Sequence, residues 1–204
     1  MNLILSMAVT GEVDKMIPSN CLLVLAAVAE AAGHRVRIVF PVQLEEFLKD
    51  PKELVDCDVF GMSVNSFNWY ATKRALEIVH ATNPRTKIVL GGPHPTYVAE
   101  HCLKTTDADV VFRGEAERSF PQFLEALEGG SSFEHVKGIT YRAVDGTIVA
   151  NQPADMLTVE EMNALPLPAF DKIPAGLYDF VPVETSRGCF FHCKFCALPF
   201  PQTL

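Results

Sequence analysis

The sequence predicts an α/β protein built around a doubly wound parallel sheet of five strands. Two observations lead to this prediction. Within the first 130 residues, short apolar runs alternate five times with helical patterns, which is the order of βα units in such sheets. The first run, residues 3–9, is apolar almost throughout, as expected of a central parallel strand buried on both faces.

Each element has its own local signal. Gly33 and the pair Gly129-Gly130 follow two of the predicted helices, where glycine commonly ends a helix, and Asn83-Pro84 stops a third. The strands are predicted over residues 3–9, 36–40, 58–64, 87–90 and 109–112. The helices are predicted from Ser19 or Asn20 to just before Gly33, and over residues 44–48, 69–81, 97–103 and 120–127.

The pattern changes after residue 130. Two short β runs, residues 136–141 and 147–150, flank Asp145-Gly146, which is typical of a hairpin turn. Residues 151–176 carry four prolines and little periodicity, which predicts an extended linker. A further strand is expected at 181–185. The predicted division is therefore a sheet domain over 1–132, a hairpin and linker over 133–180, and the start of a second domain over 181–204.

Composition excludes several functional classes. Of the 204 residues, 49% are apolar and 21% are charged, and the net charge is −8 with no local cluster of Lys and Arg. We therefore expect no nucleic-acid partner. The apolar N-terminal run is too short to span a bilayer, so no membrane is expected. Cys21, Cys57 and Cys102 lie in apolar surroundings and are interpreted as reduced core residues, which predicts a cytoplasmic protein.

Three cysteines near the C-terminus, Cys189, Cys193 and Cys196, have the spacing C-x₃-C-x₂-C. Soft thiolates at this spacing favour an iron–sulfur cluster or zinc. A cubane cluster has four irons, so three cysteines leave one iron open to a small molecule. His192 could complete a Cys₃His zinc site, although it directly precedes Cys193. A disulfide would leave one thiol over. The spacing alone supports the cluster and zinc equally.

Ligands of open parallel sheets bind beyond the carboxyl ends of the strands. No G-x-G-x-x-G follows the first strand, which disfavours a dinucleotide. The paired glycines Gly91-Gly92 permit close approach to the backbone, or form only a tight turn. The loops to consider are residues 10–20, 41–43, 63–65, 91–96 and 113–117.

Two resemblances sharpen these hypotheses. The run Glu184-Thr-Ser-Arg-Gly-Cys189, continued to Cys196, resembles the cluster loop of the radical S-adenosylmethionine superfamily. The preceding region resembles the Rossmann-like cobalamin-binding domain of cobalamin-dependent members, through three matching stretches in the expected order. These are Gly61-Met-Ser-Val-Asn65, Lys87-Ile-Val-Leu-Gly-Gly-Pro-His-Pro-Thr96 and Val111-Phe-Arg-Gly-Glu-Ala-Glu117. The hairpin and the run Leu165-Pro-Leu-Pro-Ala169 also fit.

The resemblance implies three cofactors. A 4Fe–4S cluster would be held by the three cysteines, S-adenosylmethionine would bind its open iron, and cobalamin would bind at the strand ends. The implied cobalamin-binding residues are Ser63, Asn65, Gly91, Gly92, Pro93, His94, Gly114 and Glu115. Loop 10–20 contains no histidine, so cobalt would lack the axial imidazole that many cobalamin domains supply, with His94 as the remaining candidate.

Other side chains near these loops have two interpretations each. Phe67, Trp69 and Tyr70 could line the corrin, but aromatic residues at this spacing are more often core. Glu115 and Glu117 precede the last predicted helix, where capping or hydrogen bonding to the cofactor tail is favoured over an acid/base pair.

The implied activity is that of a radical methyltransferase or related radical enzyme, supplied with electrons by a flavodoxin or ferredoxin. The chain ends eight residues after Cys196, whereas a radical barrel needs roughly 150–200 further residues by analogy with barrel sizes. We therefore expect a fragment that is inactive alone. The alternatives are a non-catalytic cobalamin-binding module and a zinc-binding Rossmann-like domain. The substrate cannot be deduced from these residues.

Overall fold

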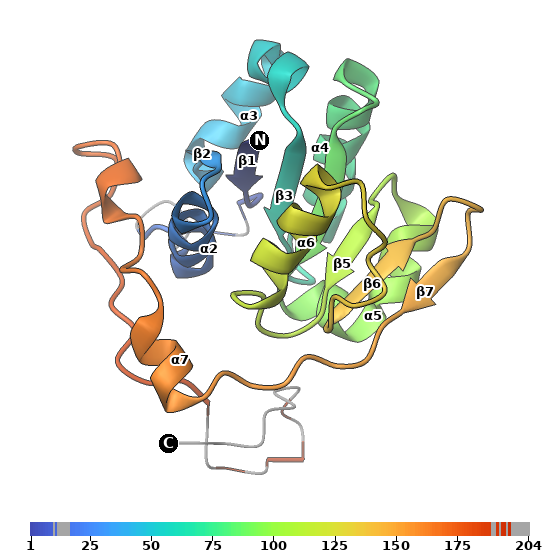
Figure 1. Cartoon of the computed structure of the whole chain (residues 1–204). Coiled ribbons are helices and arrows are strands. Elements are labelled where there is room, and N and C mark those ends of the chain that lie inside the picture. Colours follow the sequence, from blue (N-terminus) through green and yellow to red (C-terminus); the bar gives the residue numbers. More distant parts are fainter. Residues whose placement is uncertain (10, 12–16, 189–190, 192, 195, 197–204) are drawn as a thin grey trace.

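The computed structural model describes residues 1–9, 11, 17–188, 191, 193–194 and 196 of the chain (Figure 1). The strands are β1 (Asn2–Ser6), β2 (Arg35–Val39), β3 (Val59–Ser63), β4 (Lys87–Gly91), β5 (Val110–Phe112), β6 (Ile139–Arg142) and β7 (Ile148–Ala150). The α-helices are α2 (Asn20–Ala31), α3 (Pro41–Lys49), α4 (Trp69–Thr82), α5 (Pro93–Thr105), α6 (Ser119–Glu128) and α7 (Val159–Ala164). Two 3₁₀ turns are η1 (Lys52–Asp56) and η2 (Phe170–Lys172).

The described strands form one sheet in the order β2-β1-β3-β4-β5-β6-β7. Strands β1 to β5 pair in parallel, which confirms the predicted doubly wound sheet. The predicted hairpin also forms, but it continues the same sheet, because β6 pairs antiparallel with β5 and β7 with β6. The sheet therefore has seven strands instead of the five that the sequence predicted for it.

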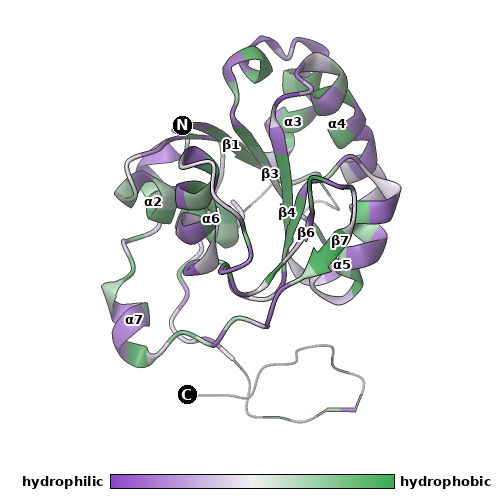
Figure 2. Ribbon diagram, turned by 45° about the vertical axis from the view of Figure 1, so that its right-hand side comes forward, coloured by the Kyte–Doolittle hydropathy of each residue, from purple (hydrophilic) through white to green (hydrophobic). Residues whose placement is uncertain are grey.

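Helices cover both faces of the sheet (Figures 1 and 2). Leu3 and Leu5 of β1 pack with α2 and α6 in one apolar core, whereas Ile4 packs with α4 and α5 in a second core. Each such side chain stabilises the fold by roughly 1.5–3 kcal/mol on burial. This two-sided burial explains why β1 is apolar without alternation. Within the described part of the chain, no helix is both long and apolar enough to cross a membrane.

Helix α5 begins four residues before its predicted start. Gly92 is its N-cap, with φ of 101°, and Pro93 and Pro95 lie in its first turn. Proline suits a first turn because its missing N–H would have no helical partner there. The backbone departs from helical geometry at Val98, near where the sequence pattern had placed the start.

The predicted extended linker contains the short helix α7. Thr158 and Glu161 form a capping box, in which the Thr158 Oγ1 accepts from the Glu161 N–H and the Glu161 carboxylate accepts from the Thr158 N–H. The sequence signal T-x-x-E was present and was missed. Farther along, the N–H of Ala169 donates to the Leu23 carbonyl of α2 at 3.1 Å. The linker is therefore bound to the sheet domain.

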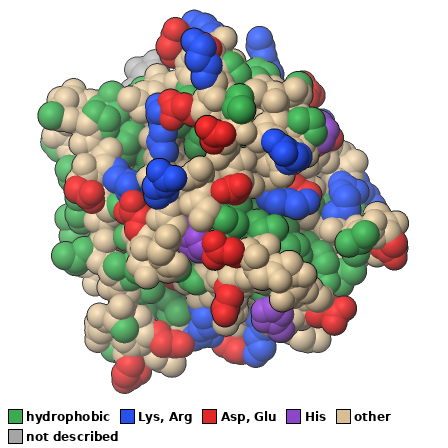
Figure 3. All heavy atoms as spheres, turned by 45° about the horizontal axis from the view of Figure 1, so that its top comes forward, with side chains coloured by type: hydrophobic (Ala, Val, Ile, Leu, Met, Phe, Trp, Pro, Cys, Tyr) green, Lys and Arg blue, Asp and Glu red, His purple; other side chains and the backbone are tan. Residues whose placement is uncertain are grey.

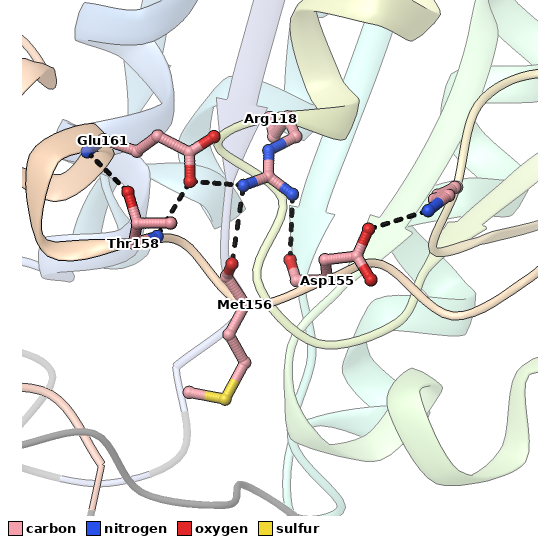
Figure 4. A network of polar contacts seen from close by, with 6 residues as sticks. Arg118, Asp155, Met156, Thr158 and Glu161 are labelled. Carbon is pink, nitrogen blue, oxygen red and sulfur yellow. Dashed lines mark hydrogen bonds and ion pairs between the residues drawn. The ribbon is translucent and has the colours of Figure 1, made fainter.

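Arg118, next to the start of α6, connects α7 to the domain (Figure 4). Its guanidinium donates to the Glu161 carboxylate at 2.5 Å, and to the carbonyls of Asp155 and Met156 at 3.2 and 3.4 Å. Asp155 in turn pairs with Lys137 at 2.7 Å. Hydrogen bonds in several directions from one planar guanidinium fix the path of the linker.

Residues 181–188 have no regular secondary structure. The prediction of a strand at residues 181–185 was therefore wrong. Val181 and Val183 are 52% and 76% exposed. A strand needs a neighbouring strand for its backbone hydrogen bonds, and this segment is not part of the seven-stranded sheet.

The face shown in Figure 3 carries acidic and basic side chains interspersed with one another. Charges of one sign do not gather there into a continuous patch. This mixture agrees with an overall charge of −8 spread among 17 basic and 25 acidic residues.

Replacing Gly92 by alanine should lower the free energy of unfolding by about 2–4 kcal/mol. A Cβ at Gly92 would lie 2.7 Å from the Val64 carbonyl oxygen and 2.9 Å from its nitrogen, at a φ of +101°, so steric overlap adds to backbone strain. Gly33→Ala is the matched control, because Gly33 also has positive φ, +88°, but open space around it. We expect it to cost only about 1 kcal/mol. Urea denaturation measures both losses. If Gly92→Ala and Gly33→Ala lowered the free energy of unfolding equally, overlap with the Val64 backbone would not be the cause.

Candidate functional site

A cavity of about 540 Å³ lies at the carboxyl ends of the central strands. Strands β2 and β3 lie on opposite sides of β1, so the chain direction across the sheet reverses there, and ligands of doubly wound sheets bind at such a point. The cavity is lined from α2, from β3 and β4, from the β5–α6 loop and from the segment before the cysteines. Its lining residues include Asn20, Cys21, Leu22, Gly61, Ser63, Val89, Gly91, Gly92, Phe112, Gly114, Glu115, Glu117, Phe120, Met156, Glu184, Arg187, Phe191 and Cys196.

Of two glycines on the α2 and α6 side of the sheet, Gly61 and Gly91, only Gly91 leaves open space. A Cβ at Gly61 would lie 2.7 Å from the Leu5 Cδ2 and 3.3 Å from Val89, so the neighbouring side chains already fill that position. A Cβ at Gly91 would approach only the Phe112 Cβ, at 3.9 Å. Since Gly91 lines the cavity, any larger side chain there would extend into the cavity.

The rim near Ser63 includes a thiol that the sequence analysis misplaced. Cys21, predicted to be core, is exposed at the start of α2 and lines the cavity. Its Sγ donates to the Ser63 Oγ at 3.3 Å and lies 3.1 Å from the Ser19 Oγ. The prediction was wrong because the apolar neighbours in sequence, Leu22 and Leu23, are buried in the core, whereas Cys21 lies on the exposed side of α2.

Three of the predicted binding residues do not line the cavity: Asn65, Pro93 and His94. The Asn65 Oδ1 accepts from the N–H groups of Phe67 and Asn68 at 2.9 and 3.1 Å, so it organises the turn before α4. Pro93 begins α5. Their position in the right loops made them candidates, but the loop backbone directs them elsewhere.

His94 packs against Trp69 with ring centroids 4.8 Å apart, and its Nδ1 lies 3.1 Å from the Ser66 Oγ. Burial, followed by the nearby His101, lowers the pKa of His94, which favours a neutral ring. Among the described residues that line the cavity there is no histidine. His94 is thus placed beside α4 and not at the cavity.

The aromatic residues that follow the third strand differ in burial. Trp69 is buried and belongs to the α4–α5 core, as the favoured reading predicted. Phe67 and Tyr70 are 90% and 84% exposed, so for them the core prediction was wrong. They form an exposed aromatic surface at the start of α4.

Thr96 joins the two glycine loops at the rim. Its Oγ1 donates to the Gly92 carbonyl at 2.8 Å and accepts from the Gly114 N–H at 3.0 Å. Gly114 has φ of +81°, a conformation that glycine adopts without strain. Sequence reasoning did not single out Thr96, although a hydroxyl in the first turn of a helix is well placed to bond nearby backbone groups.

Glu115 and Glu117 are bonded to Arg187, about 70 residues later in the chain. The Arg187 Nη1 lies 2.6 Å from the Glu117 Oε1 and 3.4 Å from the Glu115 Oε1, and its Nε lies 2.9 Å from the Glu184 Oε2. Burial lowers the pKa of Arg187, but Glu117 and Glu184 more than offset this effect, so the net direction is upward. The α6 N-terminus has no side-chain cap, so neither carboxylate caps this helix, and hydrogen bonding to the cofactor tail stays a prediction.

Of the predicted metal ligands, Cys189 lies outside the described residues, as does His192. Cys193 and Cys196 are exposed, and the Cys196 N–H donates to the Cys193 carbonyl at 3.0 Å. Cys196 and Phe191 line the cavity. The predicted metal segment and the predicted cobalamin residues therefore meet at one cavity.

Cys57 and Cys102 are buried, as predicted for core residues. Burial raises the pKa of the Cys57 thiol to about 12 and that of Cys102 to about 11. Both therefore stay protonated near neutral pH, and protonated thiols are poor metal ligands.

Comparison with known proteins agrees with this geometry. Residues 7–124 match the B12 binding domain family. An uncharacterized methyltransferase of Pyrococcus horikoshii is 30% identical over 173 residues, which cover 80% of this chain and 37% of that protein. The cobalamin-dependent radical SAM methyltransferase TokK of Streptomyces tokunonensis is 25% identical, over 79% of this chain and 26% of TokK.

Among solved structures, the cobalamin-dependent S-adenosylmethionine radical enzyme OxsB with aqua-cobalamin bound has the same fold. It superposes with a TM-score of 0.67 at 18% identity, over 83% of this chain and 24% of OxsB. The chain spans about a third or less of the length of these relatives. The family match covers more than half of the chain, which therefore belongs to the B12 binding domain family and is related to the cobalamin-dependent radical S-adenosylmethionine methyltransferases.

Proposed function

We propose that this chain holds the nucleotide tail of cobalamin in the cavity, that its three C-terminal cysteines hold a 4Fe–4S cluster, and that both serve a radical S-adenosylmethionine methyltransferase or a related radical enzyme. The observation that supports this most directly is the shared cavity. The cavity under α2 and α6 is also lined by Phe191 and Cys196. Cobalamin and the iron–sulfur cluster would therefore act at one place.

The residues present fit the nucleotide tail of cobalamin. A volume of about 540 Å³ is within the usual range for small-molecule and cofactor sites, which are mainly apolar with a few placed polar groups. Leu22, Val89 and Phe112 supply apolar walls. The Asn20 Oδ1 is buried without a hydrogen-bond partner among the described residues, which is the state expected of a group that awaits a ligand.

Five of the predicted binding residues line this cavity and would contact the cofactor: Ser63, Gly91, Gly92, Gly114 and Glu115. The glycines admit close approach, and Thr96 holds two of their loops together. The residues of the chain thus shape a preformed receptor for the tail. When bound, cobalamin supplies methyl transfer, and the cluster with S-adenosylmethionine supplies radical generation.

The cysteine segment would be supplied with electrons by a small donor such as flavodoxin or ferredoxin in a reducing cytoplasm. Exposed cysteines are accessible to iron and sulfide. Cys193 and Cys196 are both exposed, and Cys196 lines the cavity. Substrate selection would reside in the two thirds of the relatives' length that this chain does not span.

Replacing Gly91 by leucine should weaken hydroxocobalamin binding by about 10- to 100-fold, because the new side chain would occupy the space under α2 and α6. Gly91 lines the cavity and has open space beyond its Cα. Binding can be measured by visible absorbance during titration and by corrin retention in gel filtration. Bound corrin should show a spectrum without histidine on cobalt.

Gly91→Ala gives the matched control, because a single methyl group leaves most of the cavity open and should change affinity little. This series is a better test than substitution of Gly92, where any Cβ overlaps Val64. Retention of corrin by Gly91→Leu at the parent's affinity, or no retention by the parent, would refute the assignment of the cavity.

Anaerobic reconstitution with iron and sulfide should load a cluster that single alanine substitutions of Cys189, Cys193 or Cys196 abolish, because two thiolates do not hold a cubane firmly. Cys57→Ala and Cys102→Ala are the controls and should load normally, since both thiols are buried. Loading is followed by iron and sulfide analysis and by the visible absorbance of the protein.

His192→Ala separates the cluster from zinc. It should leave iron loading unchanged. Stoichiometric zinc that depends on His192, with no bound sulfide, would instead support a zinc-binding domain and exclude the radical-enzyme proposal.

A further inference from the structure

Arg187 lies where two distant segments meet. Its Nε pairs with Glu184 of its own segment at 2.9 Å, and its Nη1 pairs at 2.6 Å with Glu117 of the β5–α6 loop. The side chains of Arg187 and Glu117 are 19% and 10% exposed. All three residues line the cavity. One guanidinium therefore connects the wall of the cavity to the residues that lead into Cys189.

This ion pair is well placed to hold the segment. Residues 181–188 form neither helix nor strand, so no ladder of backbone hydrogen bonds ties them to the sheet. A planar guanidinium that is bonded through both Nε and Nη1 fixes orientation as well as distance. Because Glu117 is nearly buried, loss of its partner would leave a carboxylate without compensation.

We propose that Arg187 is a positioning residue that fastens the segment before the cysteines to the cavity wall, so that filling of the cavity and the position of that segment depend on each other. The attachment of the segment to the cavity wall rests on the observed ion pairs alone. The coupling between this attachment and occupation of the cavity rests on the proposed binding of cobalamin. If cobalamin contacts the wall that Arg187 and Glu117 build, then each event favours the other by the same factor.

Trypsin provides the test, because it must engage the Arg187 side chain to cleave before Gly188. In the ligand-free protein, Glu117→Gln should raise the rate of this cleavage by about tenfold, through more frequent local opening. Glu117→Asp, which keeps the charge, should restore slow cleavage in part. The fragments are identified by mass.

Cleavage after Lys172 is the matched control within the same molecule. The Lys172 side chain is 20% exposed and pairs with Glu30 at 2.6 Å, and neither residue lines the cavity. Glu30→Gln should accelerate cleavage after Lys172 and leave Arg187 unchanged, and Glu117→Gln should do the reverse. Unchanged cleavage after Arg187 in Glu117→Gln, or acceleration at both bonds, would overturn the fastening without affecting the cobalamin proposal.

Hydroxocobalamin then tests the coupling. At saturation it should slow cleavage after Arg187 in the parent protein. Glu117→Gln should lose most of this slowing, and it should also bind hydroxocobalamin about tenfold more weakly. Equal slowing in both proteins would mean direct shielding and would overturn the coupling. If the parent retains no corrin, the proposed function fails and the coupling with it, while the ligand-free comparison still decides the fastening.

Discussion

The site depends on the absence of a side chain at Gly91, under α2 and α6. Protein interiors are packed about as densely as organic crystals, so a hollow of about 540 Å³ beside an apolar core requires a specific cause. Gly91, at the end of β4, contributes to this hollow by leaving open the space that a larger side chain would fill, whereas Leu5 and Val89 already occupy the space beside Gly61 in β3. The strands and helices that form the core would otherwise close over this space.

A hollow binds a ligand well only if its rim is rigid, because ordering the rim on binding weakens affinity. Here the rim is held by backbone geometry that only glycine adopts easily, at Gly92 and Gly114, and by Thr96 between them. The linker adds a second constraint, since Arg118 and the capped helix α7 fix the path that delivers Met156 to the cavity. Residues far apart in sequence thus form one preorganised surface.

The sequence was sufficient for the parallel sheet, because uninterrupted apolar runs and glycine stops reflect burial and local geometry. It was also sufficient for five cavity residues, which lie directly at strand ends. It did not reveal that Asn65 and His94 lie outside the cavity lining, because their direction depends on a turn, and it was wrong for Cys21, whose exposure depends on what α2 faces. Ion pairs such as Glu117 with Arg187 join segments about 70 residues apart, and no local pattern encodes such a pair.

In the segment before the cysteines, a charged side chain is mostly buried while apolar side chains are exposed, which is the opposite of the usual pattern. Its arginine is mostly buried, while Phe180, Val181 and Val183 are 58%, 52% and 76% exposed. Residues 180–183 are an uninterrupted apolar run, which is typical of a strand buried on both faces, yet a strand exists only when a neighbour pairs with its backbone. The ion pair can hold such a segment in register before pairing occurs, because it needs no strand geometry. In the described chain, this segment is therefore joined to the sheet domain by the ion pairs of Arg187 with Glu115 and Glu117 and not by strand pairing.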